Sequence, residues 1–156
     1  MTPTPPSEPG SRPLGIDIEI EDEAWAAALP DAQRLALEAA EAATAEGGLT
    51  VLLTDDATVA DLNERFRGKP GPTNVLSFPA PANPENHLGD IALAYGVCAR
   101  EAAEQGKPLA HHLQHLVAHG VLHLVGYDHQ TETEAEEMEA LERRILAGLD
   151  VPDPYA

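Results

Sequence analysis

Three histidines in the run from His119 to His129 constrain the fold more than any other feature of the chain. The run reads HGVLHLVGYDH. Residues four apart lie about 40° apart around an α-helix and one turn apart along it, so His119 and His123 project side by side. On a continued helix His129 would lie about 9 Å further along and about 120° round, out of reach. We therefore expect the helix to stop at Gly126, because glycine adopts the left-handed conformation that ends a helix and reverses the chain.

Such a turn would bring the three imidazoles together as a metal site. Three neutral imidazoles at about 2.0 Å suit zinc, and three protein ligands leave the fourth tetrahedral position open, as in catalytic sites. The alternative is that the histidines are satisfied by hydrogen bonds within the core, because Leu116 to Val125 is apolar on almost every side of the helix. We favour the metal site and expect one Zn²⁺ per chain, held by His119, His123 and His129.

Three more histidines, His111, His112 and His115, precede this run on the same predicted helix. His115 could replace His129 in a purely helical site, but it would lie a further turn away from His123. We expect the three preceding histidines to support the site, line its wall or lie at the surface.

Gly120 limits the chemistry expected at this site. The histidine spacing matches the extended zinc-protease pattern, in which a glutamate after the first histidine acts as general base on the metal-bound water. This chain has Gly120 at that position, which argues against peptide hydrolysis. Phosphodiesters fit better, because zinc can polarise a phosphoryl oxygen and lower the pKa of its water to about 7.

Length and composition predict one domain over residues 14–156, preceded by a disordered proline-rich arm over residues 1–13. The chain has 156 residues, of which 43% are hydrophobic, enough for a genuine core. No apolar stretch approaches about 20 residues and no export signal is evident, so we expect a cytoplasmic protein without a membrane span. The lone Cys98 is expected to be a small buried residue rather than half of a disulfide.

The net charge of −18 argues against binding of nucleic acid through an extended basic surface. The acidic residues crowd the beginning of the chain and the last helix, whereas Arg65, Arg67 and Lys69 form a local basic cluster. This cluster is either a small basic cleft on an acidic body or a solvated loop.

The order of the predicted elements favours an α+β fold. Strands are expected over 15–20, 49–54, 74–78 and 88–95. Helices are expected over 30–46, from 55 or 56 to the break at 68–72, over 97–105, over 108–126 and after 131. Thr131 and Glu134 form a capping box for the last helix, whose apolar face is expected to carry Met138, Leu141 and Ile145. Strands come early and helices cluster late, which favours one sheet packed with several helices.

Two further segments complete a recognisable set of motifs. Arg67-Gly68-Lys69 leads to TNVLSFP at 73–79, and LGDI follows at 88–91. With the histidine run, these segments closely resemble the YbeY family of bacterial rRNA maturation factors over about residues 15–155. The resemblance implies a metal-dependent, single-strand-specific endoribonuclease that acts in maturation of the 3′ end of 16S rRNA and in ribosome quality control. It also implies a mainly parallel four-stranded sheet and a zincin-like metal helix.

In that family the three motif histidines bind zinc, which agrees with the ligands named above, and an important arginine falls on Arg67. We expect Arg67 and the ligand His119 to be catalytic, and Arg67 and Lys69 to contact substrate. A guanidinium offers a fork of donors matched to phosphate oxygens, so Arg67 could hold the scissile phosphate and stabilise transition-state charge. Whether water or the ribose 2′-hydroxyl attacks the phosphate stays open.

Tyr127 and Asp128 are candidate partners for the second nitrogens of the metal-binding imidazoles, which commonly donate to a carbonyl or carboxylate. Alternatively, Asp128 shapes the turn after Gly126.

The expected partners are single-stranded RNA, precursor rRNA and the small ribosomal subunit with its proteins, with no DNA and no membrane. Because the chain is so acidic, we expect affinity to come mainly from ribosomal proteins or the precursor particle. Three alternatives stay open: another metal-dependent hydrolase, including a peptidase; a non-catalytic, zinc-stabilised ribosome assembly factor; and a regulator that binds RNA without cutting it.

Overall fold

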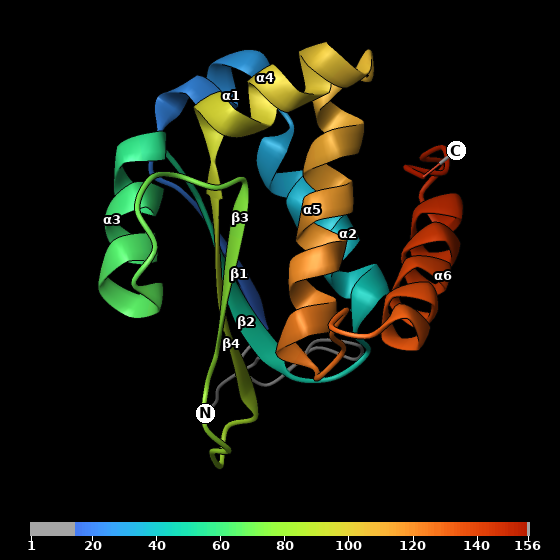
Figure 1. The fold of residues 1–156 in the computed structure, drawn as a ribbon. Coiled ribbons are helices and arrows are strands. Elements are labelled where there is room, and N and C mark those ends of the chain that lie inside the picture. Colours follow the sequence, from blue (N-terminus) through green and yellow to red (C-terminus); the bar gives the residue numbers. More distant parts are fainter. Residues whose placement is uncertain (1–14, 156) are drawn as a thin grey trace, which may run out of the picture.

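The computed structural model describes residues 15–155, which form one four-stranded sheet packed between helices (Figure 1). The residues predicted as a disordered arm, 1–13, lie outside this range. In chain order the elements are β1 (Ile16–Ile20), α1 (Glu23–Ala28), α2 (Ala32–Ala43), β2 (Gly48–Thr54), α3 (Asp56–Arg67), β3 (Val75–Pro79), β4 (His87–Ala94), α4 (Tyr95–Gln105), α5 (Leu109–Leu124) and α6 (Glu132–Gly148). Among the helices of this range, none combines the length and apolar character needed to cross a membrane.

The sheet has the strand order β1-β2-β4-β3. Strands β1, β2 and β4 run parallel, and β3 is an antiparallel edge strand beside β4. Val51 at the centre of β2 is level with Ile18 of β1 and Ile91 of β4, so branched side chains align across the parallel strands. Burial on both faces explains the near-continuous apolar sequence of β2. The predicted α+β class with a mainly parallel sheet is confirmed.

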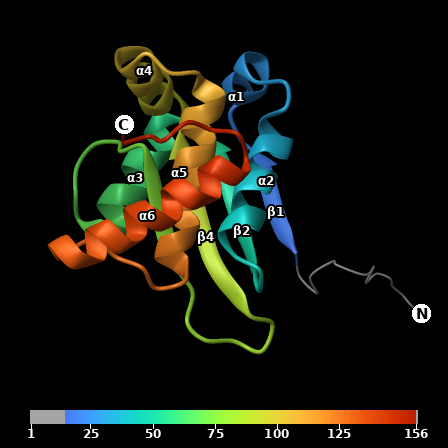
Figure 2. The same ribbon diagram turned by 90° about the vertical axis from the view of Figure 1, so that its right-hand side faces the viewer.

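Helices cover the two faces of the sheet unequally (Figure 1). Helix α3 packs on one face, where Val59 joins a small cluster with Leu76 of β3 and Ala92 of β4. The opposite face carries α2 and α5, and α6 packs outside them (Figures 1 and 2). Buried alanines such as Ala36 and Ala40 let α2 lie close to α5, and this side holds the main core.

Helix α5 carries the first two histidines of the motif and ends within two residues of its predicted limit. Beyond it the chain reverses at Gly126, which has φ +107°. The Gly126 N–H donates to the His123 carbonyl (3.1 Å), and the Tyr127 N–H donates to the Leu122 carbonyl (2.9 Å). The predicted turn at Gly126 is therefore confirmed, and it sends the following loop back toward the helix.

Two local features differ from the sequence-based expectations. The six-residue helix α1, capped by Asp22, was not predicted, because one and a half turns are too short to show helical periodicity. The capping box of Thr131 and Glu134 is present at the start of α6. The buried residues of α6, however, are Met138, Glu142 and Leu146, while the predicted Leu141 and Ile145 are half-buried. A carboxylate thus occupies the centre of the buried face.

Gly89 allows β3 and β4 to lie close together where α5 ends. Its φ is +146°, and a Cβ placed there would collide with the carbonyl oxygen of Phe78. The same Cβ would lie 2.9 Å from Cδ2 of Leu124, the last residue of α5. The pairing of β3 with β4 at this point therefore requires glycine at 89, and the Leu124 side chain packs against it.

We expect Gly89→Ala to lower the free energy of unfolding by about 2–4 kcal/mol, because the added methyl meets main-chain atoms in a backbone conformation unfavourable to L-residues. Chemical denaturation measures this change. The matched control is Gly148→Ala in α6, where nothing lies within 4 Å of the added methyl. The control should leave stability unchanged or slightly raised, since alanine favours a helix. Equal stability of both variants would contradict the close packing at Gly89.

Candidate metal centre and adjoining cleft

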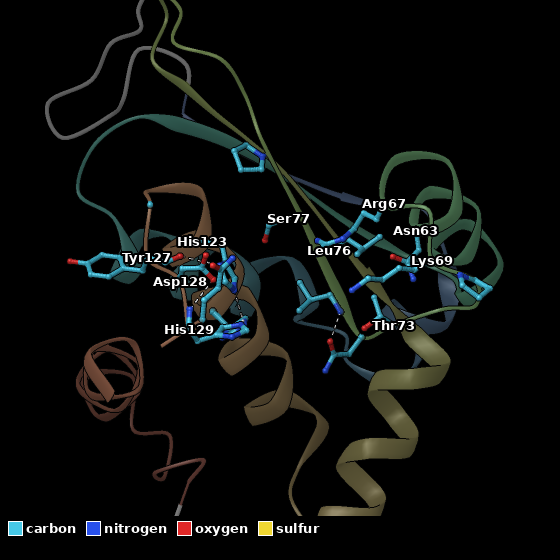
Figure 3. Close-up of a pocket in the computed structure, with 17 residues that line it drawn as sticks. Asn63, Arg67, Lys69, Thr73, Leu76, Ser77, His123, Tyr127, Asp128 and His129 are labelled. Carbon is cyan, nitrogen blue, oxygen red and sulfur yellow. Dashed lines mark hydrogen bonds between the residues drawn. The ribbon is translucent and has the colours of Figure 1, made fainter. Parts of the chain in front are cut away.

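His119, His123 and His129 meet at the C-terminal end of α5 (Figure 3). One ring nitrogen from each lies within 4.8 Å of the others. The first two rings come from consecutive turns of α5, with centroids 4.7 Å apart. The His129 ring comes from the loop after Gly126, and its centroid lies 5.6 Å from that of His119 and 5.0 Å from that of His123. The predicted three-histidine cluster is therefore present as a group that can hold a metal ion.

In His119 and His123, the hydrogen bond made by Nδ1 determines that Nε2 is the ring nitrogen facing the centre of the cluster. Nδ1–H of His119 donates to Oε2 of Glu142 (2.7 Å), and Nδ1–H of His123 donates to the carbonyl of Tyr127 (3.0 Å). Carboxylate and carbonyl oxygens are acceptors, so the proton of each neutral ring resides on Nδ1. Each Nε2 then presents a lone pair to the centre of the cluster.

The separation of these two lone pairs fits a metal site. The Nε2 atoms of His119 and His123 lie 3.2 Å apart. Two acceptors cannot hydrogen-bond to each other, so a cation between them resolves the unfavourable contact. Nitrogens held tetrahedrally at about 2.0–2.1 Å from zinc are separated by about 3.3–3.4 Å. The two helix-borne donors therefore have the separation of a metal site, and His129 offers a third imidazole within 4.8 Å.

The pKa of His123 is shifted in the direction that metal binding needs. Burial lowers the pKa of His123, and the nearby His119 and His129 lower it further. A neutral imidazole is the form that binds a metal ion. The environment of His123 thus keeps the ring available as a ligand.

Glu142 supports the cluster from α6 and was not among the residues predicted from the sequence. Its side chain is fully buried, one helical turn from Met138 on one side and from Leu146 on the other. A buried carboxylate is costly unless donors surround it. The sequence alone did not single out Glu142, because the apolar face predicted for this helix ran through Met138, Leu141 and Ile145.

Three donors converge on this carboxylate. Besides the His119 ring at Oε2, Oε1 of Glu142 accepts from Nε2–H of His115 (2.8 Å) and from the hydroxyl of Tyr155. Burial raises the pKa of Glu142, but the hydrogen bonds from His115, His119 and Tyr155 outweigh it and hold the pKa at about 2. The carboxylate is therefore ionised at neutral pH and holds the His119 ring in one orientation.

The other residues considered near the cluster have distinct roles. Asp128 accepts the main-chain N–H of His129 (2.8 Å), so it shapes the turn, one of the two alternatives expected for it. His112 is buried and bonds to Glu101 (2.9 Å), which also accepts from the amide of Asn74 (3.0 Å). This chain of contacts ties α5 through α4 to the start of β3.

A cleft of about 750 Å³ extends from the histidines across β3 to the loop after α3. Figure 3 shows the histidines on one side, Ser77 of β3 in the middle, and Arg67 and Lys69 on the other side. Within residues 15–155, neither Arg67 nor Lys69 forms an ion pair, so both charges are available to a ligand. Arg65, by contrast, pairs with Asp61 (3.0 Å) and does not line the cleft. The structure thus brings the five predicted site residues into one cleft.

Gly120 lies where α5 packs on the sheet. The Ser77 hydroxyl donates to the Gly120 carbonyl (3.1 Å). A Cβ at position 120 would lie 3.0 Å from Ile91 and 3.2 Å from the Ser77 hydroxyl. A larger side chain here, such as the glutamate that zinc proteases carry after the first histidine, would need Ile91 and Ser77 to move.

Known proteins are similar to this chain in sequence and in fold. The family model described as "Endoribonuclease YbeY" matches residues 16–150. Endoribonuclease YbeY of Maricaulis maris is 53% identical over 146 residues, covering 90% of this chain and 91% of that protein. The protein of the same name from Chelativorans sp. is 60% identical over 116 residues, covering 71% of each. The solution structure of TM1509 from Thermotoga maritima superimposes with a TM-score of 0.55 at 24% identity, covering 86% of this chain and 91% of that one, and supports the fold.

We expect Glu142→Gln to weaken metal binding by about 10- to 100-fold, the usual effect of losing a partner of a ligating histidine. An amide has one acceptor oxygen where the carboxylate has two, so one of the bound imidazoles loses its acceptor. Competition with a chromogenic chelator measures the affinity of the folded protein. Glu137→Gln, an exposed position on the same helix, is the control and should bind as the wild type does. Equal affinities would show that Glu142 does not orient His119.

Proposed function

Because the chain belongs to the YbeY family of endoribonucleases, we propose that it is a zinc-dependent, single-strand-specific endoribonuclease acting in maturation of the 3′ end of 16S rRNA and in ribosome quality control. Family membership follows from the match over residues 16–150 and from the extensive identity with the Maricaulis maris relative. It supports an endoribonuclease role, that is, hydrolysis of RNA. We further propose that the protein works in the cytoplasm on precursor rRNA.

One observation carries this proposal: a three-histidine cluster shares one cleft with two basic side chains that form no ion pair within residues 15–155. Phosphodiester cleavage needs a group that activates the reaction and a group that holds a charged phosphate. A site of about 750 Å³ has the size of a small-molecule pocket and suits a few nucleotides of a single strand better than a duplex. Bases of a single strand are also free to be contacted individually.

The residues take different roles in this proposal. His119, His123 and His129 would hold Zn²⁺, with Glu142 and the Tyr127 carbonyl orienting the two helix-borne rings. When bound, zinc supplies Lewis-acid polarisation of a phosphoryl oxygen and lowers the pKa of water.

Arg67 would bind the phosphate from the opposite wall of the cleft. Its guanidinium can donate two parallel hydrogen bonds to phosphate oxygens, and it stays charged while negative charge develops in the transition state. Lys69 would add a second positive charge for the neighbouring phosphate. We therefore assign catalysis to Arg67 and the metal ligand His119, and substrate binding to Arg67 and Lys69.

A second function is favoured by the contact between His119 on α5 and Glu142 on α6. Because the metal ligand His119 is hydrogen-bonded to Glu142 of α6, a bound ion would also stabilise the packing of α6 against α5. A zinc-stabilised assembly factor of the small ribosomal subunit would use the same residues without cleaving RNA. Loss of folding in a ligand variant indicates this structural role, whereas loss of cleavage in a folded variant indicates catalysis.

The decisive variants are His129→Ala and Arg67→Ala. We expect the wild type, purified without a histidine tag, to contain one zinc per chain by elemental analysis. His129 is exposed, so its removal should abolish metal binding and cleavage of single-stranded RNA while the fold persists. Arg67→Ala should keep the metal and lower cleavage about 100- to 1,000-fold, as expected for the loss of transition-state charge stabilisation.

Arg65→Ala is the matched control for Arg67→Ala, because it removes a neighbouring basic residue that does not line the cleft. Its cleavage rate should equal that of the wild type. A metal-free wild type, or full cleavage by His129→Ala, would overturn the proposed metal-dependent mechanism. End-group analysis of the product distinguishes attack by water, which leaves a linear phosphate, from attack by the 2′-hydroxyl, which leaves a cyclic one.

The net charge of −18 leads to a prediction about partners. Acidic faces repel free RNA and attract basic proteins, so we expect tighter binding to precursor small-subunit particles than to the same RNA without proteins. Equilibrium binding of the inactive His129→Ala variant, which keeps Arg67 and Lys69, to both targets at one salt concentration measures the difference. Equal affinity for the two would contradict a role of ribosomal proteins in recruitment.

A further inference from the structure

The chain turns back after α6 and places Tyr155 beside the histidine helix. We call residues 149–155 the return segment. Figure 2 shows it, in dark red, running back past α5. The reversal uses Asp150, whose φ is +62°, and the main-chain N–H of Val151, which donates to the Leu146 carbonyl (2.9 Å). Val151 is buried, which fixes the start of the segment against the body of the protein.

Side-chain contacts hold the other end of the return segment. Nε–H of Arg143 on α6 lies 3.2 and 3.1 Å from the two carboxylate oxygens of Asp153. Asp153 also accepts the main-chain N–H of Tyr155 (2.8 Å). The Tyr155 ring has the Arg143 guanidinium 5.3 Å from its centroid and meets the His115 ring edge-on at 5.5 Å. These contacts hold the Tyr155 ring in place independently of its hydroxyl.

The Tyr155 hydroxyl donates to Oε1 of Glu142, the carboxylate whose other oxygen accepts from His119. Burial and the adjacent carboxylate raise the pKa of Tyr155, so the hydroxyl keeps its proton and remains a donor. Glu142 is completely buried, so its carboxylate depends on the donors that the surrounding packing supplies. The loss of the hydroxyl would leave Oε1 with His115 alone and loosen the carboxylate.

We propose that Tyr155 is a positioning residue for the metal centre: its hydroxyl fixes Glu142, and Glu142 fixes the imidazole of His119. The inference rests on the metal site of the proposed function. It adds the return segment to the residues that support this site, through Glu142 of α6. It also gives residues 149–155 a role in metal affinity, although they lie outside the cleft of the three histidines.

The test is Tyr155→Phe in the full chain. This variant removes the hydroxyl and keeps the ring against His115 and Arg143. Zinc affinity of the folded protein, measured by chelator competition, should fall about tenfold, the lower end of the effect of losing a direct partner of a ligand. The visible absorption bands of the Co²⁺-loaded protein should shift as well, because they report ligand geometry. A merely structural role would lower the stability of the metal-free chain and leave both readouts unchanged.

Two comparisons make the result specific. Tyr95→Phe removes a hydroxyl on α4, where the ring packs against Trp25, and should leave zinc affinity unchanged. In a Glu142→Gln background, Tyr155→Phe should cause little further loss, because the hydroxyl acts through Glu142. Wild-type affinity in Tyr155→Phe, or full additivity with Glu142→Gln, would overturn the inference while leaving the metal site intact. A wild type that binds no metal would overturn the metal site and the inference with it.

Discussion

The hydrogen bond between Glu142 and His119 connects the fold of this protein to its site. A buried carboxylate is tolerated only where donors meet it, and here His115 and His119 of α5 and Tyr155 after α6 do so. This requirement fixes how α6 lies against α5 and holds the proton of the His119 ring on Nδ1. The inner nitrogen is then free for a metal ion. The same interaction therefore serves packing and chemistry, so its loss would affect both.

Local charge rather than net charge explains how so acidic a chain would hold the phosphate of the proposed substrate. At physiological salt, exposed charges are screened over about 8 Å, so distant acidic residues contribute little within the cleft. Four arginines of the described chain are paired with carboxylates: Arg34, Arg65, Arg100 and Arg143. Arg67 and Lys69 line the cleft without such a partner in residues 15–155. The basic cleft, one of two interpretations of this cluster, thus has a structural basis, while the acidic remainder suits contact with basic proteins.

Features set by neighbouring residues could be predicted from the sequence, and features set by tertiary packing could not. The four-residue spacing of His119 and His123, the glycine at 126 and the capping box act within one or two turns of chain. Glu142 meets His119 across 23 positions, and nothing local specifies that contact. Met138, Leu141 and Ile145 are spaced as one face of a helix, and so are the residues that are buried, Met138, Glu142 and Leu146. The sequence therefore left the rotation of α6 about its axis open, and the three donors to Glu142 determine it.

The three ligands are held to different degrees, and this difference bears on how the site would respond to a metal ion. The rings of His119 and His123 stand on a helix and are fixed from outside by Glu142 and the Tyr127 carbonyl. The His129 ring makes no side-chain hydrogen bond within residues 15–155 and is exposed on the loop between α5 and α6. A metal ion would therefore find two ligands preorganised and would order the third, along with its loop. Residues of that loop, including Tyr127 and Asp128, also line the cleft. Metal binding would accordingly shape the wall that faces the substrate, so the ion would contribute to recognition as well as to chemistry.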